Sequence, residues 1–386
     1  MKILVIHNAY QSHLIGGEDI IVQRELAALK STLGSDNIFE YIVSNDDIRM
    51  LALAQNIWGD RRHFNAIATI VREQQIDIVH IHNFFPLLTP SVFAGAKAAG
   101  AKVVHTLHNF RWWCMAGTLY RENKGNCEQC VGKALALPGI LHRCYRNSWL
   151  QSSAAALAFA WYRFKAYQQY IDAYFALSHF QLQKLLSWLP KQKLFYKPNA
   201  IVPATQLCPL TEKKGYLFVG RLEAAKGIEL LLAVWETLPS HFHLTVIGKG
   251  EDEARLIGRY KSPQISFVGQ LPHAQTLSYI AKAKYLIHSS LAYETFGLTM
   301  IEAFAHQTPV IGLNYGTRKE MIEHGKNGFL CAQEELAPTI LQSYDYANYE
   351  LLAASALKRA QQFYIQPVMT QQMNLYQKIL HEDAHA

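Results

Sequence analysis

The sequence lacks any apolar run long enough to cross a membrane as a helix. Such a helix needs about 18 consecutive apolar residues, and the longest candidate, Ala154 to Tyr162, is short and continues into Arg163 and Lys165. The N-terminus, Met1 to His7, has too short an apolar run for a signal peptide and is typical of a buried strand. We therefore expect a globular, cytoplasmic protein without a membrane-spanning segment.

An Asp-x-Asp motif is also absent. Two acids at this spacing would hold a divalent cation that bridges a diphosphate, so we expect any chemistry at a diphosphate to need no catalytic metal. His80, His82, His105 and His108 end two neighbouring predicted strands, but no carboxylate cluster accompanies them, which disfavours a metal site. Nucleic acid is not an expected partner either, because no recognised nucleic-acid module accompanies the net charge of +7.

Cysteines are few, yet four of the six fall within 31 residues: Cys114, Cys127, Cys130 and Cys144. Four thiolates around a CxxC at such spacing are compatible with a structural zinc site. Four separate reduced thiols are the alternative. A disulfide is disfavoured, because the chain shows no export signal.

Acidic residues are missing from one long stretch. Residues 1–200 hold 21 basic and 13 acidic residues, a net charge of +8. Residues 201–386 hold 16 basic and 17 acidic residues, a net charge of −1, so the overall charge of +7 comes from the first half. Between Gln129 and Ile171 basic and aromatic residues alternate without any acid: Lys133, Arg143, Arg146, Arg163 and Lys165 with Trp149, Trp161, Tyr162, Phe164 and Tyr167. This pattern favours an anionic membrane surface. Core aromatics with ordinary surface cations are the alternative.

The length of 386 residues, half of them hydrophobic, exceeds what one core normally serves and predicts two domains. Short β-rich runs alternate with helical patterns in both halves, which predicts doubly wound parallel sheets in an α/β fold. We expect strands at residues 2–7, 39–43, 76–82, 102–107, 173–177, 216–219, 243–247, 265–268, 284–287 and 308–311. A proline-rich linker after Lys197 separates expected domains 1–197 and 198–365.

Two glutamates, Glu294 and Glu302, flank a predicted junction between a loop and a helix. Apolar residues follow at helical spacing: Leu298, Ile301 and Ala305. The helix should begin near Phe296 and Gly297, where free N–H groups and the positive dipole end favour phosphate. The two acids would then hold hydroxyl-bearing groups on either side of a diphosphate, the layout of a sugar nucleotide. Two solvated surface acids are the alternative.

Two further strand-to-helix junctions precede this one. The turn Gly220 to Gly227 carries Arg221 and Lys226. Arginine offers a fork of hydrogen-bond donors and lysine a point charge, and both suit a diphosphate. An ordinary basic loop between a strand and a helix is the alternative. The next strand ends in small residues at Gly248, where a ligand or helix can approach the backbone. All three junctions are expected at the carboxyl edge of one parallel sheet, the usual place for a ligand.

The ordered set of motifs resembles the retaining glycosyltransferase family 4, of the GT-B fold. The resemblance includes the motifs above, Gly16-Gly17-Glu18 and His105-Thr-Leu-His108, and it runs from Met1 to about Phe363. Alone, Gly16-Gly17-Glu18 is typical of a helix N-terminus. The resemblance implies two Rossmann-like parallel-sheet domains that face one another across a cleft, the first for the acceptor and the second for the donor. The helix at about 366–386 would pack back on the first domain.

Residue roles follow from this resemblance. Arg221 and Lys226 would contact the donor diphosphate, Glu294 the donor sugar and Glu302 the ribose, while His108 would lie near the transferred sugar. Further donor-side positions are Gly16, Gly17, Gly248, Phe296, Gly297 and Leu298, and Glu18 and His82 lie on the acceptor side. After Pro198-Asn199 the frequent Gly and Asp of the family are replaced by Ala200 and Pro203, which puts contacts from the linker in doubt.

The resemblance implies a retaining hexosyltransferase that moves a sugar from a nucleotide diphosphate sugar to a lipid-linked or polysaccharide acceptor. No cofactor would be required, and the enzyme would act in cell-envelope glycan synthesis, as a cytoplasmic protein peripheral on the inner face of the membrane. A non-catalytic sugar-nucleotide or glycan-binding subunit and a GT-B phosphorylase or epimerase are the alternatives.

Overall fold

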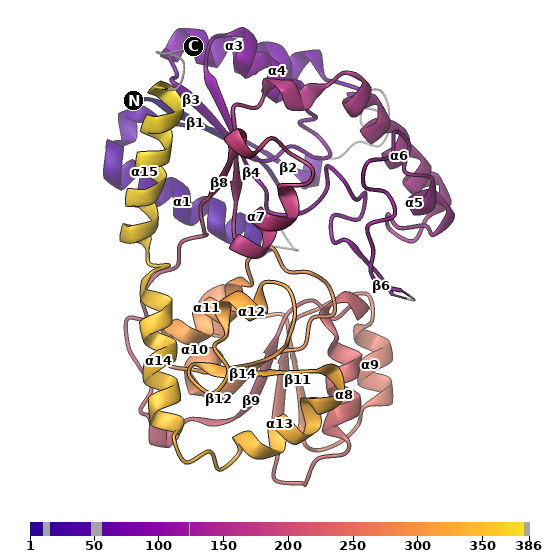
Figure 1. The fold of residues 1–386 in the computed structure, drawn as a ribbon, viewed down its shortest axis with the longest axis vertical. Helices are drawn as coiled ribbons and strands as arrows, with labels where there is room; N and C mark the ends of the chain where they lie inside the picture. Colours follow the sequence, from indigo (N-terminus) through magenta and orange to yellow (C-terminus); the bar gives the residue numbers. More distant parts are fainter. Residues whose placement is uncertain (11–15, 48–55, 123, 382–386) are drawn as a thin grey trace. The chain divides into compact units, whose positions relative to one another are not determined.

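The computed structural model describes residues 1–10, 16–47, 56–122 and 124–381 (Figure 1). The chain divides into two compact units. Unit 1 comprises Met1–Thr118, Glu128–Ala200 and Ile365–Ala386, and unit 2 comprises Leu119–Cys127 and Ile201–Tyr364. The sequence places the boundary between residues 197 and 198, whereas the chain passes into unit 2 after Ala200. A short hairpin, β5 (Tyr120–Arg121) and β6 (Gly125–Asn126), also groups with unit 2.

Unit 1 contains a parallel sheet with the strand order β2-β1-β3-β4-β7-β8. Its strands are β1 (Ile3–Ala9), β2 (Ile38–Ser44), β3 (Ile78–Asn83), β4 (Lys102–Thr106), β7 (Ala173–Ala176) and β8 (Leu194–Tyr196). Its helices are α1 (Gly17–Leu33), α3 (Arg61–Gln74), α4 (Ser91–Ala98), α5 (Leu137–Leu141), α6 (Trp149–Phe164), α7 (His179–Leu185) and α15 (Ile365–His381). Helices cover both faces of the sheet, and this explains why its central strands are buried along almost their whole length.

Strand alternation divides the core of unit 1 into two layers. Leu4 and Ile6 of β1 pack in one cluster with apolar residues of α3, α4 and α6. Ile3 and Val5 point to the opposite face and pack with α1 and α15. The last helix, α15, is therefore part of the core of unit 1.

Unit 2 repeats the plan with the strand order β11-β10-β9-β12-β13-β14, again parallel. Its strands are β9 (Lys214–Val219), β10 (Leu244–Ile247), β11 (Ile265–Gly269), β12 (Ala283–His288), β13 (Val310–Leu313) and β14 (Gly328–Cys331). Its helices are α8 (Ile228–Trp235), α9 (Glu253–Arg259), α10 (His273–Lys282), α11 (Leu298–Ala305), α12 (Arg318–Met321), α13 (Leu336–Ser343) and α14 (Tyr349–Gln361). The two parallel sheets confirm the expected α/β class.

The sequence did not predict β8 and β14, which are short strands at the edges of their sheets. Three or four residues carry too little periodicity to be recognised. Across the described parts of the chain, the structure contains no helix with the length and apolar character needed to cross a membrane.

Candidate functional site

Three loops of unit 2 meet at the ends of its central strands. β10, β9 and β12 are neighbours in the sheet, and the loops that follow them touch through glycines. A Cβ atom on Gly248 (φ +141°) would lie 1.8 Å from the carbonyl oxygen of Gly220, and one on Gly227 (φ +64°) 2.1 Å from that of Ser289. Both positions therefore require glycine. The structure thus brings together the three junctions selected from the sequence.

Lys226 and Glu294 form the centre of this arrangement. Lys226 ends a short 3₁₀ turn (Ala224–Lys226), and its Nζ donates to Glu294 Oε1 at 2.7 Å. Glu294 lies in the loop before α11, a helix that begins at Leu298 with Gly297 (φ +81°) as its N-cap. The carboxylate and ammonium thus lie beside a helix N-terminus, where backbone N–H groups lack intrahelical partners.

Burial of the Glu294 carboxyl opposes its ionisation, but the charge and hydrogen bond of Lys226, together with the charge of Arg318, outweigh this effect and hold its pKa well below the usual range. Burial also lowers the pKa of His288 to about 3, so this imidazole is neutral although its Nε2 lies 3.9 Å from Glu294 Oε1. Arg318 is almost fully buried, and one of its guanidinium nitrogens has no hydrogen-bond partner among the described residues. Glu294 is therefore a carboxylate that stays ionised because the positively charged Lys226 and Arg318 lie near it.

Sequence reasoning missed His288 and Arg318. Arg318 comes from the start of α12, stacks over Tyr315 with 4.2 Å from its guanidinium carbon to the ring centroid, and donates from Nε to the Leu313 carbonyl at 2.9 Å. His288 ends β12. The one available signal for His288 was its position at a strand carboxyl end, six residues before Glu294.

Glu302 is a buried residue in the second turn of α11. Its Oε1 lies 2.8 Å from Nε2 of His273, the first residue of α10. Phe296 is also buried, packing edge-on against Phe363 with 5.5 Å between ring centroids. Arg221 instead is exposed and pairs with Glu223 at 2.9 Å. Phe296 therefore supports the loop, whereas Arg221 presents its guanidinium to solvent.

In unit 1, Gly16 is the N-cap of α1, and its N–H donates to Asp19 Oδ2 at 3.2 Å. Gly17 is the first residue of the helix. The adjacent Glu18 is half-buried in the first turn, and the Tyr10 hydroxyl donates to its Oε2 at 3.3 Å. Burial raises the pKa of Glu18 to about 7, and neighbouring Asp19 adds to this rise. Glu18 is thus a carboxyl group that retains its proton close to neutral pH.

His108 and His82 form a second pair in unit 1. His82 Nδ1 and His108 Nε2 lie 2.8 Å apart and the rings stack. Burial lowers the pKa of His82 to about 3 and places the pKa of His108 well below its usual value, so both imidazoles are neutral. A neutral imidazole beside a sugar can donate or accept one hydrogen bond without adding charge.

The sequence shows no carboxylate cluster near these histidines, but the fold brings one carboxylate to them. Glu25 of α1 lies 3.2 Å from His80 Nδ1 and 3.6 Å from His82 Nε2, and this set is the one described group with metal-ligand spacing. Its carboxylate is already engaged, because Lys197 Nζ contacts Oε2 and Gln372 Nε2 donates to Oε1 at 2.7 Å. The Lys197 ammonium supplies the positive charge that a metal would bring. The set is therefore a buried charge network.

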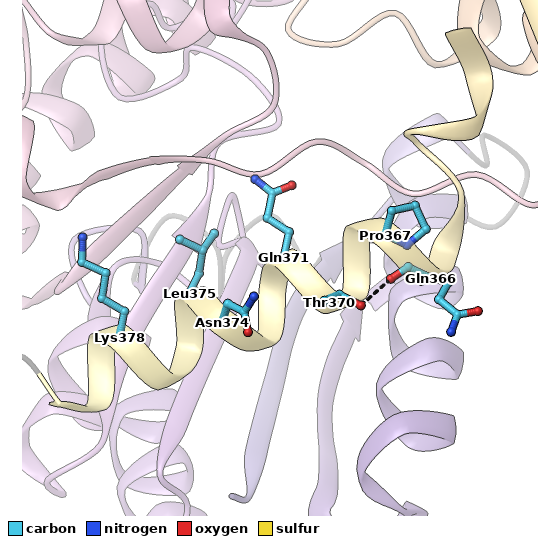
Figure 2. Close-up of a pocket in the computed structure, with 7 residues that line it drawn as sticks. All are labelled: Gln366, Pro367, Thr370, Gln371, Asn374, Leu375 and Lys378. Atoms are coloured by element: carbon cyan, nitrogen blue, oxygen red, sulfur yellow. Dashed lines mark hydrogen bonds between the residues drawn. The ribbon is translucent and has the colours of Figure 1, made fainter. Parts of the chain in front are cut away.

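The clustered cysteines do not converge in the same way. Within unit 1, Cys114, Cys130 and Cys144 do not form a group with metal-ligand spacing among the described residues. Cys130 and Cys144 pack instead against a small apolar cluster around Met115 and Ala155. A pocket shown in Figure 2 is lined by residues of α15 alone, from Gln366 to Lys378, and none of the sequence-predicted site residues lines it.

Comparison with known proteins gives two family matches. Residues 39–204 match the description "Glycosyltransferase Family 4", and residues 209–347 match "Glycosyl transferases group 1". An uncharacterized glycosyltransferase of Haemophilus influenzae is 32% identical over 144 residues, which are 36% of this chain and 40% of that relative. The chain thus spans about two fifths of this curated relative.

Solved structures match over nearly the whole chain. Sucrose-phosphate synthase from Thermosynechococcus elongatus has a TM-score of 0.71 at 19% identity and covers 99% of each chain. Anabaena HepE, in complex with UDP, has a TM-score of 0.65 at 16% identity and covers 98% of this chain and 100% of its own. These likenesses confirm the GT-B fold. Since the two family matches follow one another from residue 39 to residue 347, the chain belongs to the family 4 glycosyltransferases.

Proposed function

We propose that the protein is a retaining hexosyltransferase that takes its sugar from a nucleotide diphosphate sugar. The observation that carries the proposal is the Lys226–Glu294 pair at 2.7 Å, held where three glycine-containing loops meet at the start of α11. An ammonium and free helix N–H groups suit a diphosphate, and a carboxylate that stays ionised accepts hydrogen bonds from sugar hydroxyls.

Each residue then has a role. Arg221 and Lys226 stabilise the negative charge that develops on the departing diphosphate, and Glu294 orients the sugar. Glu302, with His273 fixing its carboxylate, accepts from the ribose hydroxyls. Departure of the diphosphate is assisted on the face from which the acceptor attacks, so no dedicated protein base is required. The neutral His108 contacts the transferred sugar, and the protonated Glu18 contacts the acceptor.

We further propose a lipid-linked or polysaccharide acceptor, a site at the inner face of the cytoplasmic membrane, and leaving-group stabilisation without a catalytic metal. Arg221, Lys226 and the α11 amides carry the charges that this last step needs. A structural zinc on Cys114, Cys127, Cys130 and Cys144 remains a prediction for metal analysis of freshly purified protein.

The test is the affinity for a nucleoside diphosphate alone, measured by calorimetry. Arg221→Ala and Lys226→Ala should each lower the affinity by about 1.5 to 3 kcal/mol, since each removes a charge-assisted contact to phosphate. Lys326 is an exposed lysine of unit 2 that pairs with Glu323. The variant Lys326→Ala is the matched control and should bind the nucleoside diphosphate as wild type does. Unchanged affinity in both site variants would remove these residues from the donor site.

Two assays address the alternative functions. Slow hydrolysis of the donor sugar without acceptor would exclude a non-catalytic binding subunit. Release of nucleoside diphosphate that depends on an added acceptor would argue against a phosphorylase or epimerase.

A further inference from the structure

The outward face of α6 is apolar. Its exposed positions include Leu150, Leu157 and Phe164, with exposed fractions of 80%, 48% and 78%. These three residues recur every seven positions, which places them in one line along the helix. A surface helix normally turns charged or polar residues to water, whereas α6 is apolar on this outward face as well as on its buried face.

Neighbouring residues extend this face. Trp149 at the start of α6 is 46% exposed, and Leu137 and Leu141 of the adjoining α5 are 55% and 63% exposed. In Figure 1, α5 and α6 lie side by side. Six of the fifteen exposed large apolar side chains in the described chain therefore fall between residues 137 and 164. Scattered apolar residues need no explanation, but a contiguous group marks an interaction surface.

Cations border the apolar face. Arg143, Arg146 and Lys165 are exposed at the two ends of α6, and no acid occurs between Gln129 and Ile171 to neutralise them. The Arg143 guanidinium carbon lies 5.3 Å from the Trp149 ring centroid, and Lys165 Nζ lies 5.9 Å from that of Phe164. Arg143 and Lys165 thus each lie next to an aromatic ring of the apolar face, and the Arg146 guanidinium carbon lies 5.5 Å from the Tyr145 ring centroid.

We propose that this face, defined as Leu137, Leu141, Trp149, Leu150, Leu157 and Phe164 with Arg143, Arg146 and Lys165, docks on an anionic phospholipid bilayer. An apolar face that enters the acyl boundary, with a basic border at headgroup level, is the combination that interfacial helices use. A second copy of the chain is a poorer occupant, because a two-fold contact would oppose the same cations on both copies. The inference deepens the proposed function, since it brings the enzyme to a lipid-linked acceptor.

The structure also corrects the residues that composition suggested. Tyr162 is fully buried, and Trp161 donates from Nε1 to the Trp58 carbonyl at 2.6 Å. Arg163 donates to the Ala134 carbonyl at 3.0 Å. These three therefore serve the fold, and the aliphatic residues Leu150 and Leu157 take the place that the aromatics were expected to fill.

Co-sedimentation of the full chain with vesicles tests the proposal. Wild type should bind vesicles of equal phosphatidylglycerol and phosphatidylcholine and bind pure phosphatidylcholine far more weakly. Raising the salt from 0.1 M to 1 M shortens the screening length from about 10 Å to about 3 Å and should release the protein. Equal binding to both vesicle types, or no binding to either, would overturn the proposal.

Two variants separate the two parts of the face. Arg143→Gln/Arg146→Gln/Lys165→Gln should lower vesicle affinity about 100-fold, since each cation contributes about fivefold. Leu150→Ser/Leu157→Ser/Phe164→Ser should lower it at least about tenfold, because less apolar surface leaves water. Leu351→Ser/Lys358→Gln, which changes an exposed leucine and lysine of α14, is the matched control and should bind as wild type does.

Two outcomes would count against the assignment. If the serine variant bound vesicles like wild type, the face would not be the docking surface. If wild type dimerised without lipid and the serine variant did not, the occupant would be a second copy. Calorimetry with a nucleoside diphosphate on the same proteins reports the donor site separately, so failure here and failure of the proposed function remain distinguishable.

Discussion

Replacing Lys197 by methionine should destabilise unit 1 strongly. Lys197 and Glu25 are both almost fully buried, at 1% and 5% side-chain exposure, and form an ion pair between α1 and the segment after β8. Methionine retains most of the side-chain volume but no charge. The variant therefore leaves the Glu25 carboxylate with no cationic partner, beside the neutral His80 at 3.2 Å and the Gln372 amide, which donates to it at 2.7 Å.

The expected cost is about 3 to 5 kcal/mol of the free energy of unfolding at neutral pH, the range for a buried pair that loses one partner. Burial opposes ionisation of Glu25, and Lys197 is the largest influence that keeps its pKa well below the usual value. A lowered carboxyl pKa stabilises the fold above the unfolded value, near 4.5, and this contribution is lost as the pH falls. The difference between variant and wild type should therefore shrink below about pH 4.5.

Urea unfolding followed by tryptophan fluorescence measures this cost. Six of the seven tryptophans lie in unit 1 and so report on it: Trp58, Trp112, Trp113, Trp149, Trp161 and Trp188. Lys30→Met is the matched control, because Lys30 is on α1 and pairs with Glu40 at the surface, where the cost should stay below about 1 kcal/mol. An equal cost for the two variants would refute the reasoning. Glu25→Gln/Lys197→Met should cost less than the sum of its single changes, since neither charge is then left alone.

The remaining predictions concern Glu18 and metals. Because burial raises the pKa of Glu18 to about 7, the unfolded chain releases its proton first, and stability falls as pH rises from about 4.5 to 7. Glu18→Gln should therefore add about 3 kcal/mol at pH 8 and little at pH 4.5 in the same unfolding assay; an equal gain at both values would contradict the assignment. Activity should survive exhaustive chelation while the protein stays folded, and recovery of a fully inactivated, folded enzyme by added magnesium or manganese would show otherwise. If the clustered cysteines hold zinc, removing it should lower the unfolding midpoint, and a metal assay that finds no zinc on reduced protein would contradict that prediction.

Local patterns predicted much of the fold and of the unit 2 loops. Strands such as β1 and β10 are apolar runs bounded by turn residues, and the glycines at 227 and 248 come from turns whose geometry demands them. The contact between Lys226 and Glu294 follows from parallel topology, because the carboxyl ends of neighbouring strands lie at one edge.

Contacts between residues that are far apart in the chain produce no local pattern in the sequence, so they could not be predicted from it. Glu25 and Gln372 are 347 positions apart, and neither residue lies in a motif. Composition alone also does not say which way a side chain turns, so it left Tyr162 open between a membrane surface and the core, and the structure places it in the core. Cys114, Cys130 and Cys144 are close in sequence, yet within unit 1 they do not form a group with metal-ligand spacing among the described residues.

The place of α15 in unit 1 determines the order in which the protein can be completed on the ribosome. The first strands of unit 1 precede unit 2 in the chain, but its Met369, Tyr376 and Ile379 are translated only after the 164 residues of Ile201–Tyr364. At about 5 to 20 residues per second, the nascent first unit waits roughly 10 to 30 s for its last helix. During that interval the sheet face covered by α1 lacks the apolar side chains of α15, so unit 1 completes its core only after the whole of unit 2 has been translated.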